Sequence, residues 1–125
     1  MPLVRITGRH DVRTLRALGD AVHDALVAAI GIPPDDRFQI LTAATAETLV
    51  SDAGYLGHRR ESPAIVEITL RGGRTNDQKR ALYAEIARGA QRAGVRADDV
   101  MVVLHENQPV DWSFGGGVAD YALTG

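Results

Sequence analysis

The chain contains no cysteine, few aromatic residues and little net charge. Without cysteine it can form no disulfide, no thiolate nucleophile and no zinc–thiolate site. Its net charge of −2 and its scattered arginines lack the basic patch of a nucleic-acid-binding protein. No apolar run approaches the length of a membrane span, and the N-terminus shows no secretory leader. We therefore expect a cytoplasmic protein with neither a nucleic-acid nor a membrane partner.

The start of the chain is its most informative feature. Pro2 directly follows Met1 and precedes an alternating apolar stretch at 3–6 that predicts a strand. If Met1 is removed, as a small second residue favours, Pro2 becomes a secondary amine held at the tip of that strand. An α-amine titrates at about pH 8, and burial or nearby cations lower its pKa, so it can act as a general base, acid or carbonyl nucleophile. The alternative is that Met-Pro is merely a tolerated start.

An internal repeat organises the sequence. Residues 2–41 and 64–105 each read as strand, Gly-Arg, amphipathic helix, glycine, Asp-Asp and strand, with matching positions 63 to 65 residues apart. Two copies are too few for a solenoid, so we interpret them as a duplicated βαβ unit. The chain is then a single domain over 1–125, with a C-terminal tail at 106–125.

Both predicted helices carry capping signals. Asp11 can cap the first helix, and Gly31 ends it. Thr75 and Gln78 form a capping box for the second helix, which Gly94 closes. Apolar positions recur at helical spacing in each helix, at Leu15, Leu18, Val22, Leu26 and Ile30 and at Leu82, Ile86, Ala90 and Ala93.

The remaining segments complete the predicted architecture. Residues 65–70 and 100–104 are strand-like by β-branched content, and the connection between the halves is expected to hold a short helix at 45–50. If a pseudo-twofold axis relates the two units, right-handed crossovers place both helices on one face of a four-stranded mixed sheet, and we expect this α/β (α+β) fold. The open apolar face of such a sheet predicts self-association, most simply as a closed ring.

Three stretches, in order behind Pro2, resemble the tautomerase superfamily and specifically its branch near malonate semialdehyde decarboxylase. They are Asp-Asp-Arg-Phe-Gln-Ile at 35–40, Arg-Gly-Gly-Arg at 71–74 with Gln-Lys at 78–79, and Asp-Trp-Ser-Phe-Gly at 111–115. The resemblance implies a tautomerase-like βαβ fold and a homotrimer. It also implies small keto- or unsaturated acids as substrates, with no metal or organic cofactor.

The resemblance assigns roles to polar residues. Pro2 matches the catalytic proline, Arg71 and Arg74 match the pair that holds a substrate carboxylate, and Asp36 matches an acidic residue that orients or polarises the substrate or a water. Arginine suits this task because its planar fork binds a carboxylate bidentately. Two glycines separate the arginines, whereas the decarboxylase pattern has one residue there, and this spacing is closer to cis-3-chloroacrylate dehalogenase. The alternatives are solvated arginines and a loop aspartate that caps a turn.

Further residues have both a functional and a structural interpretation. Trp112, Phe114 and Tyr121 match an apolar wall that excludes water from the site, although packing in the core or between subunits explains them equally well. Arg9, the repeat counterpart of Arg74, either enters the site or stabilises the fold. The histidines lack metal-ligand spacing and are interpreted as surface or capping residues: His10, His23, His58 and His105.

Decarboxylation of malonate semialdehyde or a similar β-oxo acid is the predicted reaction. Cationic Pro2 would polarise the aldehyde or condense with it to an iminium, giving the electrons released with CO2 a sink. Alternatively, neutral Pro2 would move a proton in an enol–keto tautomerase of the phenylpyruvate or 4-oxalocrotonate type. Hydration or dehalogenation of 3-haloacrylate-like acids and a non-catalytic trimeric binding protein are the other candidates.

Overall fold

The computed structural model describes residues 2–121 of the 125-residue chain. None of the helices in this part is long and apolar enough to cross a membrane. Strand, helix and strand follow one another twice, as the repeat predicts. The elements are β1 (Leu3–Gly8), α1 (Val12–Ile30), β2 (Phe38–Ala43), β3 (Ala64–Arg71), α2 (Asn76–Arg92) and β4 (Val100–Asn107), with short 3₁₀ helices η1 (Tyr55–Gly57), η2 (Ala97–Asp99) and η3 (Pro109–Asp111).

Alternation along the central strands decides which side chains enter the core. In β1, Val4 and Ile6 are buried while Arg5 between them is exposed, and Val66 and Ile68 repeat the pattern in β3. The buried positions of the strands pack against the apolar stripes of both helices. Every stripe position predicted for the first helix is buried, and so are three of the second: Leu82, Ile86 and Ala90.

Both helices begin and end at the predicted capping residues. The Asp11 carboxylate accepts a backbone N–H of the first turn of α1 at 2.8 Å, and Gly31 follows the helix with a φ of 80°. Thr75 and Gln78 form the reciprocal capping box of α2. Gly94, with a φ of 88°, turns the chain away after α2.

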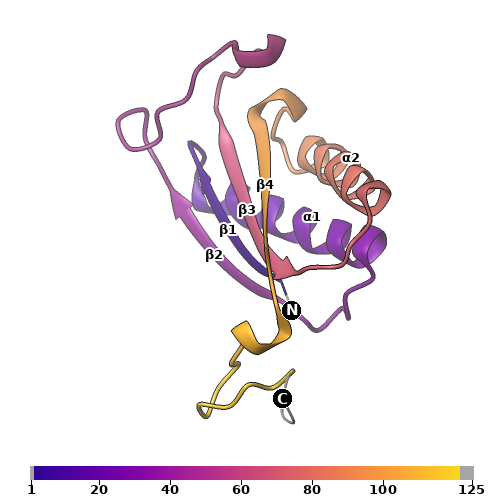
Figure 1. Ribbon diagram of the computed structural model, residues 1–125. Coiled ribbons are helices and arrows are strands. Elements are labelled where there is room, and N and C mark those ends of the chain that lie inside the picture. Colours follow the sequence, from indigo (N-terminus) through magenta and orange to yellow (C-terminus); the bar gives the residue numbers. More distant parts are fainter. Residues whose placement is uncertain (1, 122–125) are drawn as a thin grey trace.

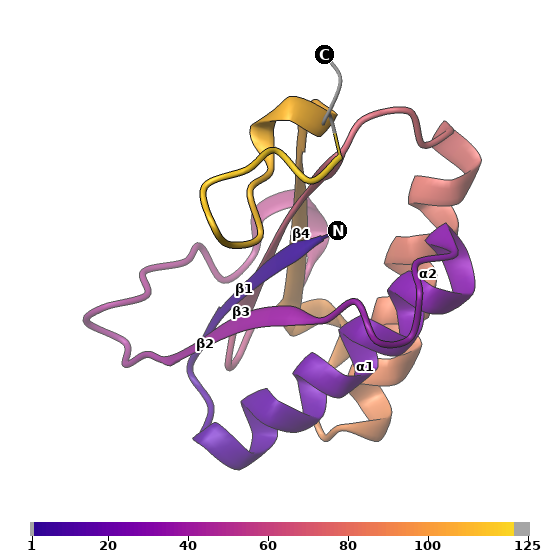
Figure 2. The same cartoon turned by 90° about the horizontal axis from the view of Figure 1, so that it is seen from below.

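The sheet has the strand order β2-β1-β3-β4. β1 pairs with β2 in parallel, β1 with β3 antiparallel, and β3 with β4 in parallel. Both helices cover the same face of this sheet (Figure 1), and Figure 2 shows the sheet lying between them and the C-terminal segment. The four-stranded mixed sheet with helices on one face is therefore confirmed.

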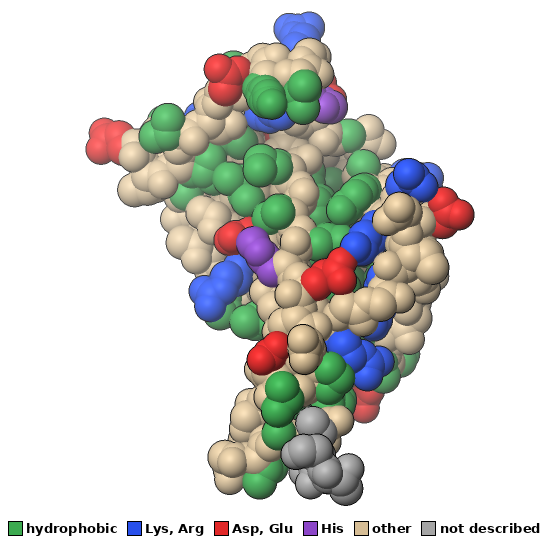
Figure 3. All heavy atoms as spheres, viewed as in Figure 1, with side chains coloured by type: hydrophobic (Ala, Val, Ile, Leu, Met, Phe, Trp, Pro, Cys, Tyr) green, Lys and Arg blue, Asp and Glu red, His purple; other side chains and the backbone are tan. Residues whose placement is uncertain are grey.

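The opposite face of the sheet is open in the described part of the chain. Phe38, Ile40 and Met101 on this face are 49%, 43% and 50% exposed. Hydrophobic side chains gather over the sheet in Figure 3, next to a histidine and acidic groups. Arg5 and Glu67 occupy paired positions on the two central strands of this face. A monomer rarely exposes so many large apolar side chains on one surface, so the face is suited to association with another chain.

The expected short helix at 45–50 is wrong: the segment is a turn. The Oγ of Thr45 accepts the N–H of Glu47 at 3.2 Å, and the N–H of Thr45 itself donates to the Oγ of Thr48 at 2.8 Å. The backbone N–H of Leu49 then closes the turn on the carbonyl of Thr45 at 2.9 Å. Threonine side chains bind the local backbone here in place of helical partners, so the segment forms a turn and not a helix.

Candidate active site

Four strand ends meet at one end of the sheet, where β1 and β2 begin and β3 and β4 end. Leu3 at the start of β1 pairs with Phe38 at the start of β2 and with Thr69 near the end of β3. Pro2, one residue before Leu3, is buried here. Figure 2 looks toward this end and shows the start of β1 close to the C-terminal segment. The topology thus gathers residues from both repeats and from the tail around the N-terminus.

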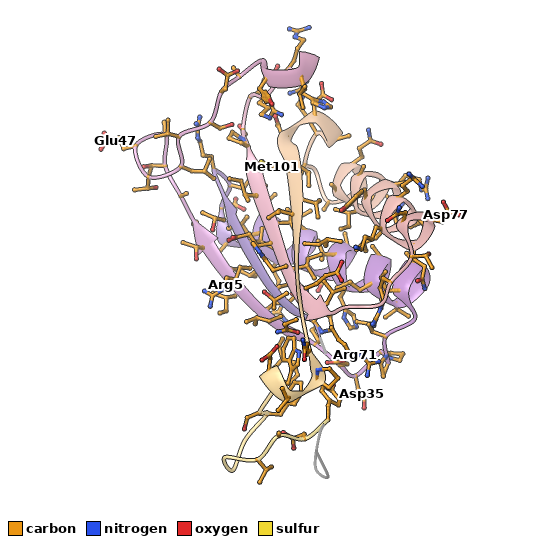
Figure 4. All side chains as sticks on the ribbon, in the orientation of Figure 1. Arg5, Asp35, Glu47, Arg71, Asp77 and Met101 are labelled. Atoms are coloured by element: carbon orange, nitrogen blue, oxygen red, sulfur yellow. The ribbon has the colours of Figure 1, made fainter. Side chains whose placement is uncertain are left out.

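A charged cleft of about 250 Å³ lies at this end. It brings together Asp36 from the loop before β2, Arg71 from the end of β3 and Arg74 from the loop before α2. Figure 4 labels Arg71 and Asp35, the neighbour of Asp36, at the same end of the molecule. The full lining is Gly31, Ile32, Pro33, Asp36, Arg71, Arg74 and Tyr121.

The loop between the two arginines requires a glycine at Gly73, and at Gly72 a side chain would have to displace the end of Glu106. A Cβ on Gly72 would lie 2.9 Å from Oε2 of Glu106, and the Gly72 N–H donates to a backbone carbonyl at the end of β4 at 2.9 Å. Gly73 has a φ of 111°, a conformation that other residues rarely adopt. The two-residue spacing of Arg71 and Arg74 is therefore part of how β3 passes into α2.

The two guanidinium groups differ in their surroundings. Arg71 is exposed, and its guanidinium has no hydrogen bond or ion pair with another residue of 2–121. Arg74 is half-buried, and its Nη1 donates to the carbonyl oxygen of Arg71 at 3.4 Å. Burial and the charge of Arg71 lower the pKa of Arg74, and Glu106 opposes this shift. Arginine stays charged nonetheless, so a bound anion would relieve the repulsion between the pair.

Asp36 is half-buried and reaches the cleft from a tight turn. Its backbone N–H donates to the carbonyl of Pro33 at 3.0 Å, soon after α1 ends. Arg37, the next residue, is bound to Asp20 at 2.5 Å and to Gln39 at 3.0 Å. The guanidinium of Arg37 is therefore fixed against α1, and the turn presents Asp36 to the two arginines of the other repeat.

An apolar cleft of about 420 Å³ lies beside the charged one. The Trp112 and Phe114 rings stack with centroids 5.6 Å apart, and Phe114 also contacts Phe38 at 5.6 Å and Tyr121 at 5.2 Å. Because Tyr121 lines the charged cleft, this aromatic cluster joins the two clefts. The apolar cleft is lined by Leu3, Phe38, Thr69, Asn107, Asp111, Trp112, Ser113 and Phe114.

Side-chain hydrogen bonds anchor the C-terminal segment over the strand ends. The Trp112 indole N–H donates to Oδ1 of Asn107 at 2.7 Å, and the Phe114 N–H donates to Oδ2 of Asp120 at 2.8 Å. The glycines at 115–117 have φ values of 154°, 70° and 74°, which let the chain reverse. This reversal returns the segment to the aromatic cluster of its own chain.

The predicted site residues divide between the two clefts, except Pro2, which lines neither. Asp36, Arg71, Arg74 and Tyr121 share the charged cleft, while Trp112 and Phe114 line the apolar one. Pro2 is buried next to Leu3, a residue of the apolar cleft. Sequence analysis missed several other lining residues, among them Phe38 and Asn107. The matched stretch at 35–40 contains Phe38, but only the pairing of β2 with β1 places it at the site.

Other polar candidates lie away from the clefts. Arg9 sits at the opposite end of β1, where its Nε donates to the carbonyl of Leu49 at 3.0 Å, which favours the structural interpretation. Across residues 2–121, no three His, Asp or Glu side chains are arranged to hold a metal ion. The histidines have separate partners: Ser62 for His10, Pro34 for His23, Asp98 for His58 and Glu67 for His105.

Sequence comparisons agree with the fold and the site. Two family models, each described as a tautomerase enzyme, match residues 36–115 and 2–58. YusQ of Bacillus subtilis (strain 168), a probable tautomerase, is 39% identical over 124 residues, which cover 95% of this chain and 97% of YusQ. The chain belongs to the tautomerase superfamily and is an enzyme of that superfamily.

Solved structures refine this placement. The crystal structure of FG41 malonate semialdehyde decarboxylase inhibited by 3-bromopropiolate matches with a TM-score of 0.90 and 40% identity, covering 96% of this chain and 94% of that one. A symmetric trimer of fused 4-OT matches with a TM-score of 0.72 and 30% identity, covering 97% of each chain. The chain thus falls in the branch of the superfamily that resembles malonate semialdehyde decarboxylase.

Proposed function

We propose that the chain decarboxylates malonate semialdehyde or a closely related β-oxo acid. The observation that carries the proposal is the single cleft that holds Asp36, Arg71 and Arg74 at the N-terminal end of β1. In this reaction the bond between the carboxylate and the α-carbon breaks and CO2 leaves. The electron pair of that bond moves toward the neighbouring carbonyl carbon, and a proton then restores the α-carbon of the aldehyde product.

The mechanism requires a free amine at Pro2. Met1 lies outside the described residues, and we propose that it is removed to leave Pro2 as a secondary amine. The protonated amine polarises the aldehyde oxygen; alternatively, the neutral amine adds to the carbonyl and expels water to form an iminium. Either state accepts the electrons released with CO2. The buried position of Pro2 at the end of a paired strand holds the nitrogen in place.

Arg71 and Arg74 bind the substrate carboxylate in this scheme. Each guanidinium can donate two parallel hydrogen bonds, and two adjacent cations in a partly buried cleft favour an anion strongly. Binding by both arginines would orient the acid so that the bond between its carboxylate and its α-carbon lies parallel to the π orbitals of the carbonyl. That alignment is what lets the electron pair pass into the carbonyl group.

Asp36 and the aromatic cluster complete the proposed site. Asp36 lines the same cleft as the arginines, and we assign it to orienting the substrate carbonyl or a water. Trp112, Phe114 and Tyr121 would exclude bulk water, which strengthens the charge interactions inside. The scheme uses only the N-terminal amine and side chains of this chain.

Enol–keto tautomerisation is the second candidate. YusQ is called a probable tautomerase, and the apolar cleft of about 420 Å³ offers room for the ring of a phenylpyruvate-type substrate. Neutral Pro2 would then carry a proton between the oxygen and carbon of the substrate. The two-residue spacing of Arg71 and Arg74 makes hydration or dehalogenation of a 3-haloacrylate-like acid a further activity to assay.

We also propose that the enzyme works as a homotrimer. The exposed Phe38, Ile40 and Met101 on the open sheet face supply an apolar surface for the contact, and one structural neighbour is a symmetric trimer. A closed ring covers this face on every copy. Sedimentation velocity of the purified protein measures the assembly directly.

The reaction is tested by incubating the protein separately with malonate semialdehyde and with phenylenolpyruvate and following the products by NMR. Decarboxylation that disappears in Pro2→Ala and falls in Asp36→Asn supports the proposal. The matched control is Asp35→Asn, which alters the exposed neighbour of Asp36 outside the cleft lining and should leave the rate unchanged. Efficient ketonisation of phenylenolpyruvate without any decarboxylation would replace the proposal with the tautomerase.

A further inference from the structure

An ion pair that the proposed mechanism does not use lies next to the arginine loop. Lys79 in the first turns of α2 binds Glu106 near the end of β4 through its ammonium group. The Lys79 side chain is 25% exposed and the Glu106 side chain 39% exposed. Lys79 also belongs to the stretch at 78–79 that follows the Arg-Gly-Gly-Arg motif. The capping box accounts for its neighbour in that stretch but not for Lys79 itself.

The carboxylate of Glu106 lies against the backbone that separates the arginines. The Gly73 backbone N–H helps to lower the pKa of Glu106, and a Cβ on Gly72 would come within 2.9 Å of its Oε2. Lys79 holds the other oxygen, Oε1. Glu106 is therefore bound by Lys79 of α2 and lies against the loop that leads to Arg74.

Arg74 lies within range of the negative charge of Glu106 but forms no ion pair with it. The charge of Glu106 opposes the downward shift in the pKa of Arg74. Among residues 2–121, Arg74 forms no ion pair, and its guanidinium donates to the backbone carbonyl of Arg71. A nearby carboxylate without a partner of its own would bind a half-buried guanidinium and compete there with any acid entering the cleft.

We propose that Lys79 is a positioning residue that holds Glu106 away from Arg74 and so keeps Arg74 available for the carboxylate of the substrate. The inference rests on the proposed function in one respect, the binding of a carboxylate by Arg74. It adds that the affinity for the acid is set by a pair of residues outside the cleft lining. In this view Glu106 is an internal competitor for Arg74, and Lys79 neutralises it.

The test measures binding of malonate, a non-reacting dicarboxylate, by titration calorimetry. Lys79→Met frees Glu106 to bind Arg74, so the Kd for malonate should rise by roughly tenfold, within the range found for coupled neighbouring charges. In the double variant Lys79→Met/Glu106→Gln the competitor is gone, and the Kd should return to within about threefold of the wild-type value. A purely structural pair would not recover when its second member is also removed.

Two control variants sharpen the result. Arg80→Met removes a cation from the same helix, and its pairing with Asp77 at 3.0 Å lies on the exposed surface, so the Kd should stay unchanged. Lys79→Arg keeps the charge and should bind malonate as the wild type does. In steady-state assays Lys79→Met should raise KM far more than it lowers kcat.

The outcomes separate this inference from the proposed function. If Arg74→Ala leaves malonate binding unchanged, Arg74 does not bind the acid and the proposed function loses its basis. If Arg74→Ala weakens binding but Lys79→Met does not, the inference alone is wrong. The inference also fails if the double variant binds malonate as weakly as Lys79→Met does.

Discussion

Asp36 and Asp99 occupy equivalent places before the second strand of each repeat, yet their surroundings are opposite. Asp36 is half-buried and lines the charged cleft. Asp99 is 2% exposed, and its carboxylate accepts the backbone N–H groups of Glu61 at 2.7 Å and Ser62 at 3.2 Å. Arg96 donates to it as well at 3.3 Å. One aspartate therefore lines the charged cleft, and the other closes the connection between the repeats.

The arginines of the two repeats differ in the same way. Arg74 faces the charged cleft at one end of the sheet. Arg9, its counterpart at the other end, donates through its side chain to the carbonyl of Leu49 and through its backbone N–H to Pro63, both at 3.0 Å. Those contacts tie the long connection between the halves to β1. The second end of the sheet thus uses the repeated residues for stability.

The nitrogen at the start of the first strand also differs between the two repeats. Phe38 and Met101 each lie two residues after the aspartate of their repeat, and they pair with Leu3 and Ile65 respectively. The counterpart of the N-terminal proline is consequently Ala64, one residue before Ile65. Its nitrogen is an internal amide without basicity, so amine chemistry is possible at one end only.

The largest expected effect comes from the nitrogen itself. Pro2→Ala replaces a secondary amine with a primary one, which alters both geometry and basicity, and kcat/KM should fall by about 10²–10⁴-fold. Pro63→Ala, the matched change before β3, alters a nitrogen that is already an amide and should leave kcat/KM near the wild-type value. Steady-state kinetics of both variants decide the matter. Equal losses in the two variants would remove the proposed difference between the ends.

Alanine substitutions of the arginines should affect substrate binding at one end of the sheet and stability at the other. Arg74→Ala or Arg71→Ala removes a charge-assisted hydrogen bond to the substrate, which is worth about 1.5–3 kcal/mol, so kcat/KM should fall roughly tenfold to a hundredfold. Arg9→Ala should instead lower Tm with kcat/KM nearly unchanged. Thermal melts and kinetics on the same preparations test this. Unchanged kinetics in both cleft variants would return these arginines to the solvated surface.

Substitution of Asp99 should mainly lower stability, whereas substitution of Asp36 should mainly lower activity. Asp99→Asn weakens charge-assisted hydrogen bonds to buried backbone groups and should cost about 1–3 kcal/mol of unfolding free energy. Asp36→Asn should cost less unfolding free energy than Asp99→Asn, because Asp36 is only half-buried, while kcat/KM falls on the order of tenfold. Urea denaturation with parallel assays provides both numbers. A greater loss of stability in Asp36→Asn than in Asp99→Asn would contradict the comparison.

The smallest effect is a pH dependence shared by both ends. The backbone N–H of Arg59 lowers the pKa of Asp98, and Lys79 lowers the pKa of Glu106. A carboxyl whose pKa is lowered by folding stabilises the protein above its unfolded-state pKa of about 4, and the contribution is lost as the pH falls through the folded-state pKa. Asp98→Asn and Glu106→Gln should each flatten the fall of Tm below about pH 4.5. Curves parallel to that of the wild type would contradict both assignments.

The helices could be predicted from the sequence because their signals lie within a few residues of one another. The helical stripes, the Asp11 cap and the Thr75–Gln78 capping box depend on spacing alone, and all are confirmed except the last stripe position, Ala93. The prediction failed at 45–50, where threonine side chains took over the backbone hydrogen bonds. Helix propensity summed over six residues does not include hydrogen bonds from side chains to the backbone.

The site was predicted less completely than the fold. The division into two clefts arises from the pairing of β1 with β2 and from the return of the C-terminal segment. Those contacts join residues far apart in the sequence, so spacing could not indicate Phe38 or Asn107. The pairing of Lys79 with Glu106 spans 27 residues and was likewise invisible before the strands were placed.

The most direct test of the account is the intact mass of the active enzyme. Catalysis at one end of the sheet depends on a free amine at Pro2, so the account predicts that active protein is lighter than the encoded chain by one methionine residue. Mass spectrometry of the preparation used for the kinetic assays gives the answer. A fully active preparation in which every molecule retains Met1 would contradict the central claim, because Pro2 would then be an amide like its counterpart in the second repeat.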